Sequence, residues 1–291
     1  MAVLTISRGS YSHGKEIAEK AGRKLGYTCI SRETLLAASE AFNIPEIALL
    51  RAFEDTPSFL DRFTHGKEKY TAYIQAALLN QLKKDNVVYH GFACHAIVKD
   101  IPRILNVRIN AQLEDRVQIV MERDQVSEKQ AVRFLKKLDD DRRKWSRKLY
   151  GVDPENPGLY DLVLNLNKIT ITDAVNTICN LISLRQFQTI PESKKQMENL
   201  ALAAQVKTAL LDLKPRLEVS AGNGIVVVKT DTETAKNLEL VRRMREAGEI
   251  IPGVKRINVM AGEAFETDYP RPPESRQKST RDTTLTYFGE L

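Results

Sequence analysis

The chain contains 291 residues, enough for more than one average domain. Its hydrophobic content of 42% and charged content of 28% are typical of globular proteins and argue against wholesale disorder. The formal net charge of +6 suits a partner that carries phosphate, but over a chain of this length it equally serves solubility alone.

The cysteines and histidines favour neither a disulfide scaffold nor a zinc site. The four histidines match no common metal-ligand spacing. The three cysteines are far apart and include no CxxC pair, which favours a reducing cytoplasm: Cys29, Cys94 and Cys179. The N-terminus lacks a signal-peptide pattern, and no run of about 18 apolar residues could span a membrane. We therefore expect a cytoplasmic protein without a transmembrane segment.

The first two thirds of the chain alternate between strand and helix patterns. Residues 2–7 (AVLTIS) are apolar and β-branched and predict a buried strand. After a glycine-containing loop, Ile17, Ala21 and Leu25 recur at helical spacing, and Gly26 can end this helix. Further strands are predicted at 86–90, 104–110 and 160–165, separated by helices at about 66–85, 112–124, 127–148 and 170–187. This order predicts an α/β fold with a mainly parallel sheet covered by helices.

A second, smaller unit is predicted after a linker. Residues 188–196 (QTIPESKKQ) are polar, contain a proline and predict that linker. An amphipathic helix at 197–213, a hairpin turn at Gly222-Asn223-Gly224, a helix at 233–247 and a strand near 254–260 give an α-β-β-α-β order. The last segment contains PRPPESRQKSTRDTT and predicts a disordered tail. We therefore predict domains at 1–187 and 197–262 and a tail at 263–291.

A phosphate-binding loop is predicted directly after the first strand. Its residues have the GxxxxGK spacing of a P-loop: Gly9, Ser10, Tyr11, Ser12, His13, Gly14 and Lys15. Small residues let backbone N–H groups surround phosphate oxygens, and the N-terminus of the next helix adds positive potential. Lys15 would reach the β- and γ-phosphates of a nucleotide, whereas Glu16 replaces the usual Ser or Thr ligand of Mg²⁺. The alternative is an ordinary strand–turn–helix connection with a surface lysine.

Four segments resemble, in the same order, the cytidylate kinase-like family of P-loop nucleoside monophosphate kinases. They are ISRGSYSHGKEIAEKAGRKLGY (6–27), NVVYHGFACHAIVKD (86–100), INAQLEDR to KLYGVD (109–153) and YDLVLNLNKITITDAV (160–175). The resemblance covers about residues 1–187 and implies a P-loop NTPase-type parallel sheet with a helical lid. It also implies transfer of the γ-phosphoryl group of ATP, with Mg²⁺ bridging the phosphates, to a nucleoside monophosphate, of which the family favours cytidylate.

The resemblance also implies that arginines of the lid lie over the phosphates. Arg142 and Arg147 would close over the reaction and act with Lys15, while Arg116 would lie against the adenine or the phosphates. Guanidinium groups hold phosphate oxygens bidentately and stabilise charge in the transition state. Asp139 matches the family pattern as well. The alternative is that LDDDRRKWSRK forms a solvated charged helix, as most charge runs do.

Two departures from the family pattern concern the acceptor. Phe92 stands where the family often has the arginine of a Gly-Arg-Gly sequence, and Ser31 stands where it has an aspartate. Phe92 cannot bind a phosphate, so we expect weak or absent activity on CMP unless Arg32, Arg62 or His90 reaches the same phosphate. For His90 the alternative is a packed or surface histidine. The alternative function is a catalytically degenerate nucleotide-binding sensor that signals through the C-terminal unit.

Residues 197–262 resemble a BON domain, a small α/β fold with two helices on a sheet. The resemblance is carried by the leading helix with Val206 and Leu210, by NGIVVVK and by IPGVKRINV. BON domains are associated with phospholipid surfaces or protein partners and have no catalytic residues. The basic residues of this unit would form a binding face or serve solubility alone: Lys229, Lys236, Arg242, Arg243, Arg245, Lys255 and Arg256. No aromatic-plus-basic pattern indicates a specific nucleic-acid partner.

Overall fold

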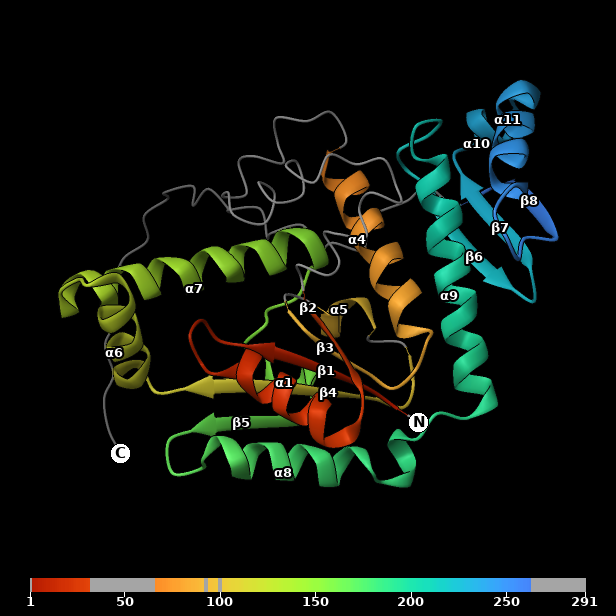
Figure 1. The fold of residues 1–291 in the computed structure, drawn as a ribbon. Helices are drawn as coiled ribbons and strands as arrows, with labels where there is room; N and C mark the ends of the chain where they lie inside the picture. Colours follow the sequence, from red (N-terminus) through yellow and green to blue (C-terminus); the bar gives the residue numbers. More distant parts are fainter. Residues whose placement is uncertain (1, 32–65, 92–93, 99–100, 263–291) are drawn as a thin grey trace, which may run out of the picture.

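The computed structural model describes residues 2–31, 66–91, 94–98 and 101–262. Its larger sheet has five parallel strands in the order β2-β3-β1-β4-β5 (Figure 1). The strands are β1 (Val3–Arg8), β2 (Thr28–Ser31), β3 (Val87–His90), β4 (Ile104–Ala111) and β5 (Leu162–Leu166). Four of them match the predicted strands. The edge strand β2 is an addition, since its four residues give too short a pattern to predict.

Helices cover both faces of this sheet (Figure 1). They include α1 (Gly14–Leu25), α4 (Gly66–Leu82), α5 (Cys94–Ile97) and α8 (Ile171–Ile182). Under α1 and α8, side chains such as Leu4 and Ile109 form one buried cluster. Under α4, Val3 and Ile104 belong to a second cluster. Successive side chains of a strand point to opposite faces, so each central strand serves both clusters, and the predicted parallel α/β fold is confirmed.

The two helices that follow β4 form a hairpin of their own. They are α6 (Leu113–Asp124) and α7 (Glu128–Tyr150), close to the bounds predicted for the helical lid. In Figure 1, α6 lies beyond the arrowhead end of β4, and α7 runs back from there toward α4. A small core holds them together: Val117, Val120, Ala131 and Leu135. α7 ends at Gly151, whose left-handed conformation (φ 68°) is one that glycine adopts without strain.

A second sheet of three strands contains the C-terminal part of the described chain. Its strands and helices are β6 (Glu218–Gly222), β7 (Ile225–Thr230), α10 (Thr232–Lys236), α11 (Leu238–Glu249) and β8 (Arg256–Ala261). Asn223 and Gly224 both have positive φ (54° and 85°) and make the two-residue turn between β6 and β7. The predicted α-β-β-α-β order is present. The helix predicted at 233–247 is divided at Asn237, whose side chain caps α11 by accepting from the Leu240 N–H.

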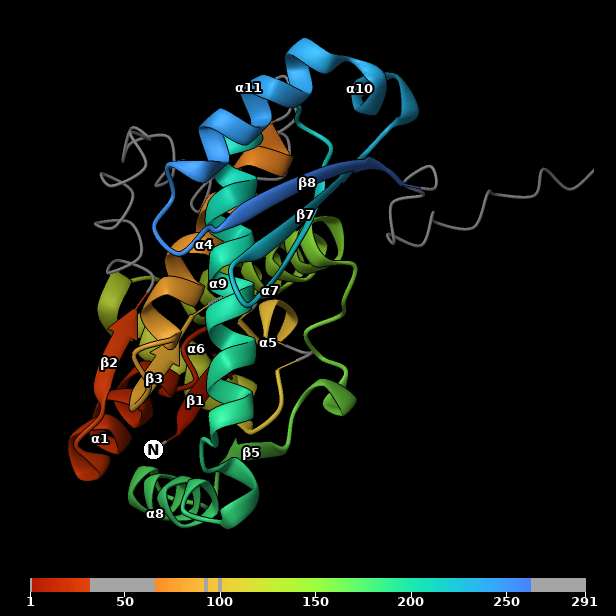
Figure 2. The ribbon, with the colours of Figure 1, turned by 90° about the vertical axis from the view of Figure 1, so that its right-hand side faces the viewer.

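The long helix α9 (Pro191–Leu210) corrects the predicted linker. Residues 191–196 are not a linker but the first turns of this helix, because proline fits the first helical position and Ser193 accepts the backbone N–H of Ile190. The first half of α9 buries Met197 and Ala201 in the cluster under α4, and its second half packs Leu210 against the second sheet. Figure 2 shows α9 running from the larger sheet to the smaller one. The division into two domains stays a prediction.

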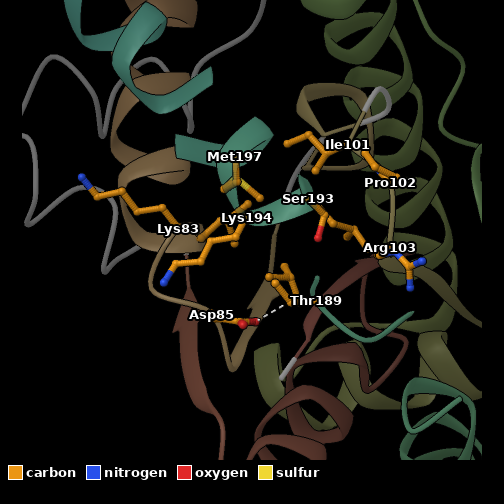
Figure 3. A pocket seen from close by; sticks show the side chains of 12 residues that line it. Lys83, Asp85, Ile101, Pro102, Arg103, Thr189, Ser193, Lys194 and Met197 are labelled. Atoms are coloured by element: carbon orange, nitrogen blue, oxygen red, sulfur yellow. Dashed lines mark hydrogen bonds between the residues drawn. The ribbon is translucent and has the colours of Figure 1, made fainter. Parts of the chain in front are cut away.

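The segment that leads into α9 is held by hydrogen bonds to the loops that precede β3 and β4. Arg103 donates to the carbonyl of Arg185 (2.9 Å) and to that of Gln188 (3.2 Å). Thr189 Oγ1 donates to Asp85 Oδ1 (3.0 Å), as Figure 3 shows. The cavity beside these residues has a volume of about 20 Å³. This volume suffices for one water-sized molecule and excludes a nucleotide there.

Two expectations concern the ends of the chain and the membrane. The predicted tail at 263–291 lies outside the described residues. Within the described part of the chain, no helix is both long and apolar enough to cross a membrane.

Candidate phosphate-binding site

The backbone between β1 and α1 has the shape of an anion-binding loop. Tyr11 and His13 have positive φ (58° and 56°), whereas Ser12 between them does not. Such alternation turns successive N–H groups toward one point, where they can bind an anion. Ser12 Oγ fixes the loop by donating to the carbonyls of Gly9 (2.9 Å) and Ile109 (3.0 Å). The loop therefore rests on β4, and its binding of phosphate stays a prediction.

Gly14, the second glycine of the motif, lies where no side chain fits. A Cβ atom added to Gly14 would come within 2.7 Å of Arg8 Cβ, a distance that real Cβ atoms do not adopt. Beside it, Ser10 is buried and its hydroxyl has no hydrogen-bond partner. A buried hydroxyl of this kind is a rare feature that a bound ligand would satisfy.

Lys15 and Glu16 begin α1 with opposite charges. The Lys15 side chain is 62% exposed, and its Nζ lies 3.9 Å from Glu19, so it can turn toward a ligand. Glu16 pairs with Lys20 (2.8 Å) and lies 3.4 Å from His13 Nδ1. The hydrogen bond from Lys20 is the main reason that the pKa of Glu16 is lowered. The Glu16 carboxylate beside the loop thus has a cationic partner, Lys20, on the same helix.

Arg116 supports the loop from α6. Its Nε donates to the carbonyl of Ser10 (2.6 Å), and its Nη2 pairs with Asp139 of α7 (2.6 Å). The Arg116 side chain is only 12% exposed. These contacts tie the loop to the helical hairpin. The predicted contact of Arg116 with adenine or phosphates stays a prediction.

Tyr11 makes a second connection between the loop and the hairpin. Its ring lies 4.7 Å from the guanidinium carbon of Arg123, whose Nη1 also donates to the Tyr11 hydroxyl. The ring of Phe134 is 6.1 Å away. These contacts could not be predicted from the sequence, because the three residues come from three separate elements.

The two predicted lid arginines both lie on α7. Arg147 pairs with Asp153 (2.5 Å), while its side chain is 60% exposed. Arg142 is partly buried. Their closure over the phosphates stays a prediction. Arg32, Arg62 and Phe92 lie outside the described residues.

A cavity of about 280 Å³ opens beside the first glycine of the loop. It is lined by Gly9, Arg108, Asn110, Ala111, Arg116, Asp139, Glu155, Pro157 and Val163. Arg108 lies within β4 and is only 9% exposed. Sequence reasoning missed it, because a strand pattern gives no indication that one of its charged residues is buried.

Buried polar side chains surround Arg108. Ser7 is its neighbour across β1 and β4, and the Tyr160 hydroxyl lies 3.3 Å from Ser7 Oγ. His95 Nδ1 lies 3.5 Å from that hydroxyl. Burial, and then the charge of Arg108, lowers the pKa of His95 to about 4. His90 is buried on β3, and its predicted contact with an acceptor stays a prediction.

His95 should make the protein less stable as the pH falls from about 6.5 to 4. Because its folded-state pKa is the lower one, the unfolded chain binds the additional proton in this window. The shift corresponds to a loss of about 3 kcal/mol. Urea unfolding at both pH values measures it, and His95→Gln should flatten the dependence. The control is His13→Gln, since His13 is only partly buried. Equal pH dependence in wild type and His95→Gln would contradict the assignment.

Comparison with known proteins gives one family and weak individual matches. The family described as cytidylate kinase-like matches residues 3–168. Cytidylate kinase of Pyrobaculum neutrophilum is 24% identical over 194 residues, which cover 65% of this chain and 100% of that protein. Cytidylate kinase of Pyrobaculum aerophilum is 23% identical over 175 residues, 60% and 89% of the two chains. The structure of an uncharacterized protein from Eubacterium ventriosum is 20% identical, with a TM-score of 0.48. The match covers 64% of this chain and 100% of that protein.

Proposed function

Because the chain belongs to the cytidylate kinase-like family, we propose that it transfers the γ-phosphoryl group of ATP to a nucleoside monophosphate. The observation that carries the proposal is the loop at Gly9–Lys15, with its alternating backbone and an exposed lysine at the start of α1. Backbone N–H groups and a helix N-terminus together favour bound phosphate. Kinase chemistry asks mainly for positioning and for charge that offsets the transferred group.

The residues around the loop fit a nucleoside triphosphate. The unpartnered hydroxyl of Ser10 would be satisfied by a bound ligand. Mg²⁺ would be bound mainly through phosphate oxygens, because the described residues bring together no three His, Cys, Asp or Glu side chains that could hold a metal. Lys15 would contact the phosphates, and Arg142 and Arg147 would close over them.

Wild-type activity on CMP should be about 10- to 100-fold below that of a variant with the family's arginine, Phe92→Arg. A charge-assisted hydrogen bond to a phosphate contributes about 1.5–3 kcal/mol, and each 1.36 kcal/mol changes a rate about tenfold. Steady-state kinetics with CMP, dCMP, UMP and AMP measure this for both proteins. Efficient wild-type turnover of CMP that Phe92→Arg does not improve would show that the acceptor is held from elsewhere.

The same assays separate the kinase from a nucleotide sensor. A thermal-shift panel of nucleotides detects binding, and the phosphoryl-transfer assay detects turnover. Turnover of any monophosphate supports the kinase. Binding of ATP without turnover of any acceptor would favour the sensor instead.

We further propose that residues 197–262 act as a BON-like module that binds a phospholipid surface or a protein partner. The α-β-β-α-β order agrees with this resemblance. Arg242 pairs with Glu239 and Glu246 on α11, which reduces its share of any basic face. The other exposed residues of the predicted basic face are Lys236, Arg243, Arg245, Lys255 and Arg256.

A further inference from the structure

Arg108 is a buried cation without a carboxylate partner among the described residues. Its Nη1 lies 3.5 Å from Ser7 Oγ, a long hydrogen bond. Its guanidinium carbon lies 5.8 Å from the centre of the Tyr160 ring. Neither contact offers a negative charge, while a guanidinium has five N–H donors to satisfy. Burying an ion without a counter-charge is costly, so the arrangement calls for an anion.

The other charged side chains of the same cavity already have partners. Arg116 pairs with Asp139 (2.6 Å), and Glu155 pairs with Arg143. Among the described residues that line the cavity, Arg108 is therefore the one charged side chain without an oppositely charged partner. The cavity of about 280 Å³ therefore has one buried, unpaired positive charge in its lining, the guanidinium of Arg108.

The position of Arg108 favours the acceptor over the donor. Val107 and Ile109 point into the cluster under α1 and α8, so Arg108, which alternates with them, emerges on the other face of the sheet. Donor phosphates would be held by the loop and the N-terminus of α1. In-line transfer needs the acceptor on the opposite side of the moving group. The cavity extends from Gly9 of the loop to Arg108 and offers that place.

We infer that Arg108 binds the phosphate of the acceptor nucleoside monophosphate, a role that rests on the proposed function. His95 and Tyr160 then serve as its neutral supports. His95 stays uncharged near neutral pH because burial and Arg108 lower its pKa. It therefore does not compete with Arg108 for the phosphate. An arginine on β4 would thereby supply one contact to the acceptor phosphate, in addition to the one that Phe92 cannot make.

Equilibrium binding to the full chain tests this inference. The acceptor probes are CMP, UMP and AMP, and the donor probe is a non-hydrolysable ATP analogue. Arg108→Met should weaken the best-bound monophosphate by about 10- to 100-fold and change binding of the ATP analogue by less than about threefold. Arg108→Lys, which keeps the charge but loses the bidentate fork, should lie in between. Arg103→Met is the matched control: this arginine starts the same strand region but donates only to backbone carbonyls of the α9 connection.

Three results would overturn the inference. The first is wild-type protein that binds no monophosphate, or Arg108→Met that binds it unchanged. The second is a loss confined to the ATP analogue, which would assign Arg108 to the donor. The third is a clear drop in melting temperature of ligand-free Arg108→Met, since removal of an unpaired buried charge should leave the temperature unchanged or raise it.

The two proposals fail in different ways. If Arg108→Met loses monophosphate binding while the wild type transfers no phosphoryl group, the kinase proposal fails and the anion site stands. If the wild type turns over a monophosphate and Arg108→Met has the same KM for it, the kinase proposal stands and the role of Arg108 is wrong.

Discussion

Replacing Lys15 with methionine should lower kcat/KM for phosphoryl transfer from ATP by about 10²- to 10³-fold. Methionine keeps much of the aliphatic stem but removes the charge that would offset the developing negative charge on the phosphates. Loss of one such electrostatic contact in an active site typically has an effect of this size. Because Lys15 is 62% exposed and makes only a long contact with Glu19, the fold should be unaffected. Steady-state measurement of ADP release provides the rate.

Lys24 offers a matched control for that experiment. It lies in the last turn of α1, and its Nζ donates to Asn176 of α8, away from the loop. Lys24→Met should therefore keep wild-type kinetics. Equal activity of Lys15→Met and wild type would remove Lys15 from the reaction, and with it the main support for a phosphate-binding loop.

Replacing Met197 with alanine should lower the free energy of unfolding by about 2–5 kcal/mol. Met197 is 5% exposed and belongs to the cluster under α4, together with Val3 and Leu79. Removing a buried side chain of this size leaves a cavity in addition to the lost burial. Leu200→Ala on the same helix is the control, since Leu200 is 36% exposed and should cost about 1 kcal/mol or less.

The chain's single tryptophan allows this loss to be located. Trp145 is buried on α7, in the part of the chain that contains the larger sheet. Denaturant unfolding followed by its fluorescence should therefore shift to lower denaturant in Met197→Ala. An unchanged fluorescence midpoint, together with a shifted midpoint of the second sheet, would mean that α9 stabilises only the C-terminal part.

The local pattern of apolar residues predicted most strands, because a short, mostly apolar run such as Val3 to Ile6 is typical of a buried parallel strand. The hairpin turn was equally predictable, since Asn223-Gly224 favours positive φ at both positions. The start of α9 was not. Among residues 191–196 only Ser193 is buried, so the first turns of this helix have no apolar stripe to detect.

The candidate site was predictable to the extent that it is local in sequence. The loop from Gly9 to Lys15 is one continuous motif, and a side chain at Gly14 would collide with Arg8. The supports from Arg116 and Arg123 join residues more than a hundred positions apart. The cluster around Arg108 likewise needs β1, β4 and α5 to be brought together first. Such contacts depend on tertiary packing and leave no trace in spacing.

The helix α9 also has a mechanical consequence. A 20-residue helix is about 30 Å long and resists bending, and this one is gripped by apolar side chains at both ends. Because Pro191–Leu210 is one continuous helix, it connects the two sheets rigidly. A partner bound to the second sheet would therefore keep a constant distance and orientation relative to the phosphate loop. A force applied to the second sheet would be transmitted through α9 to α4.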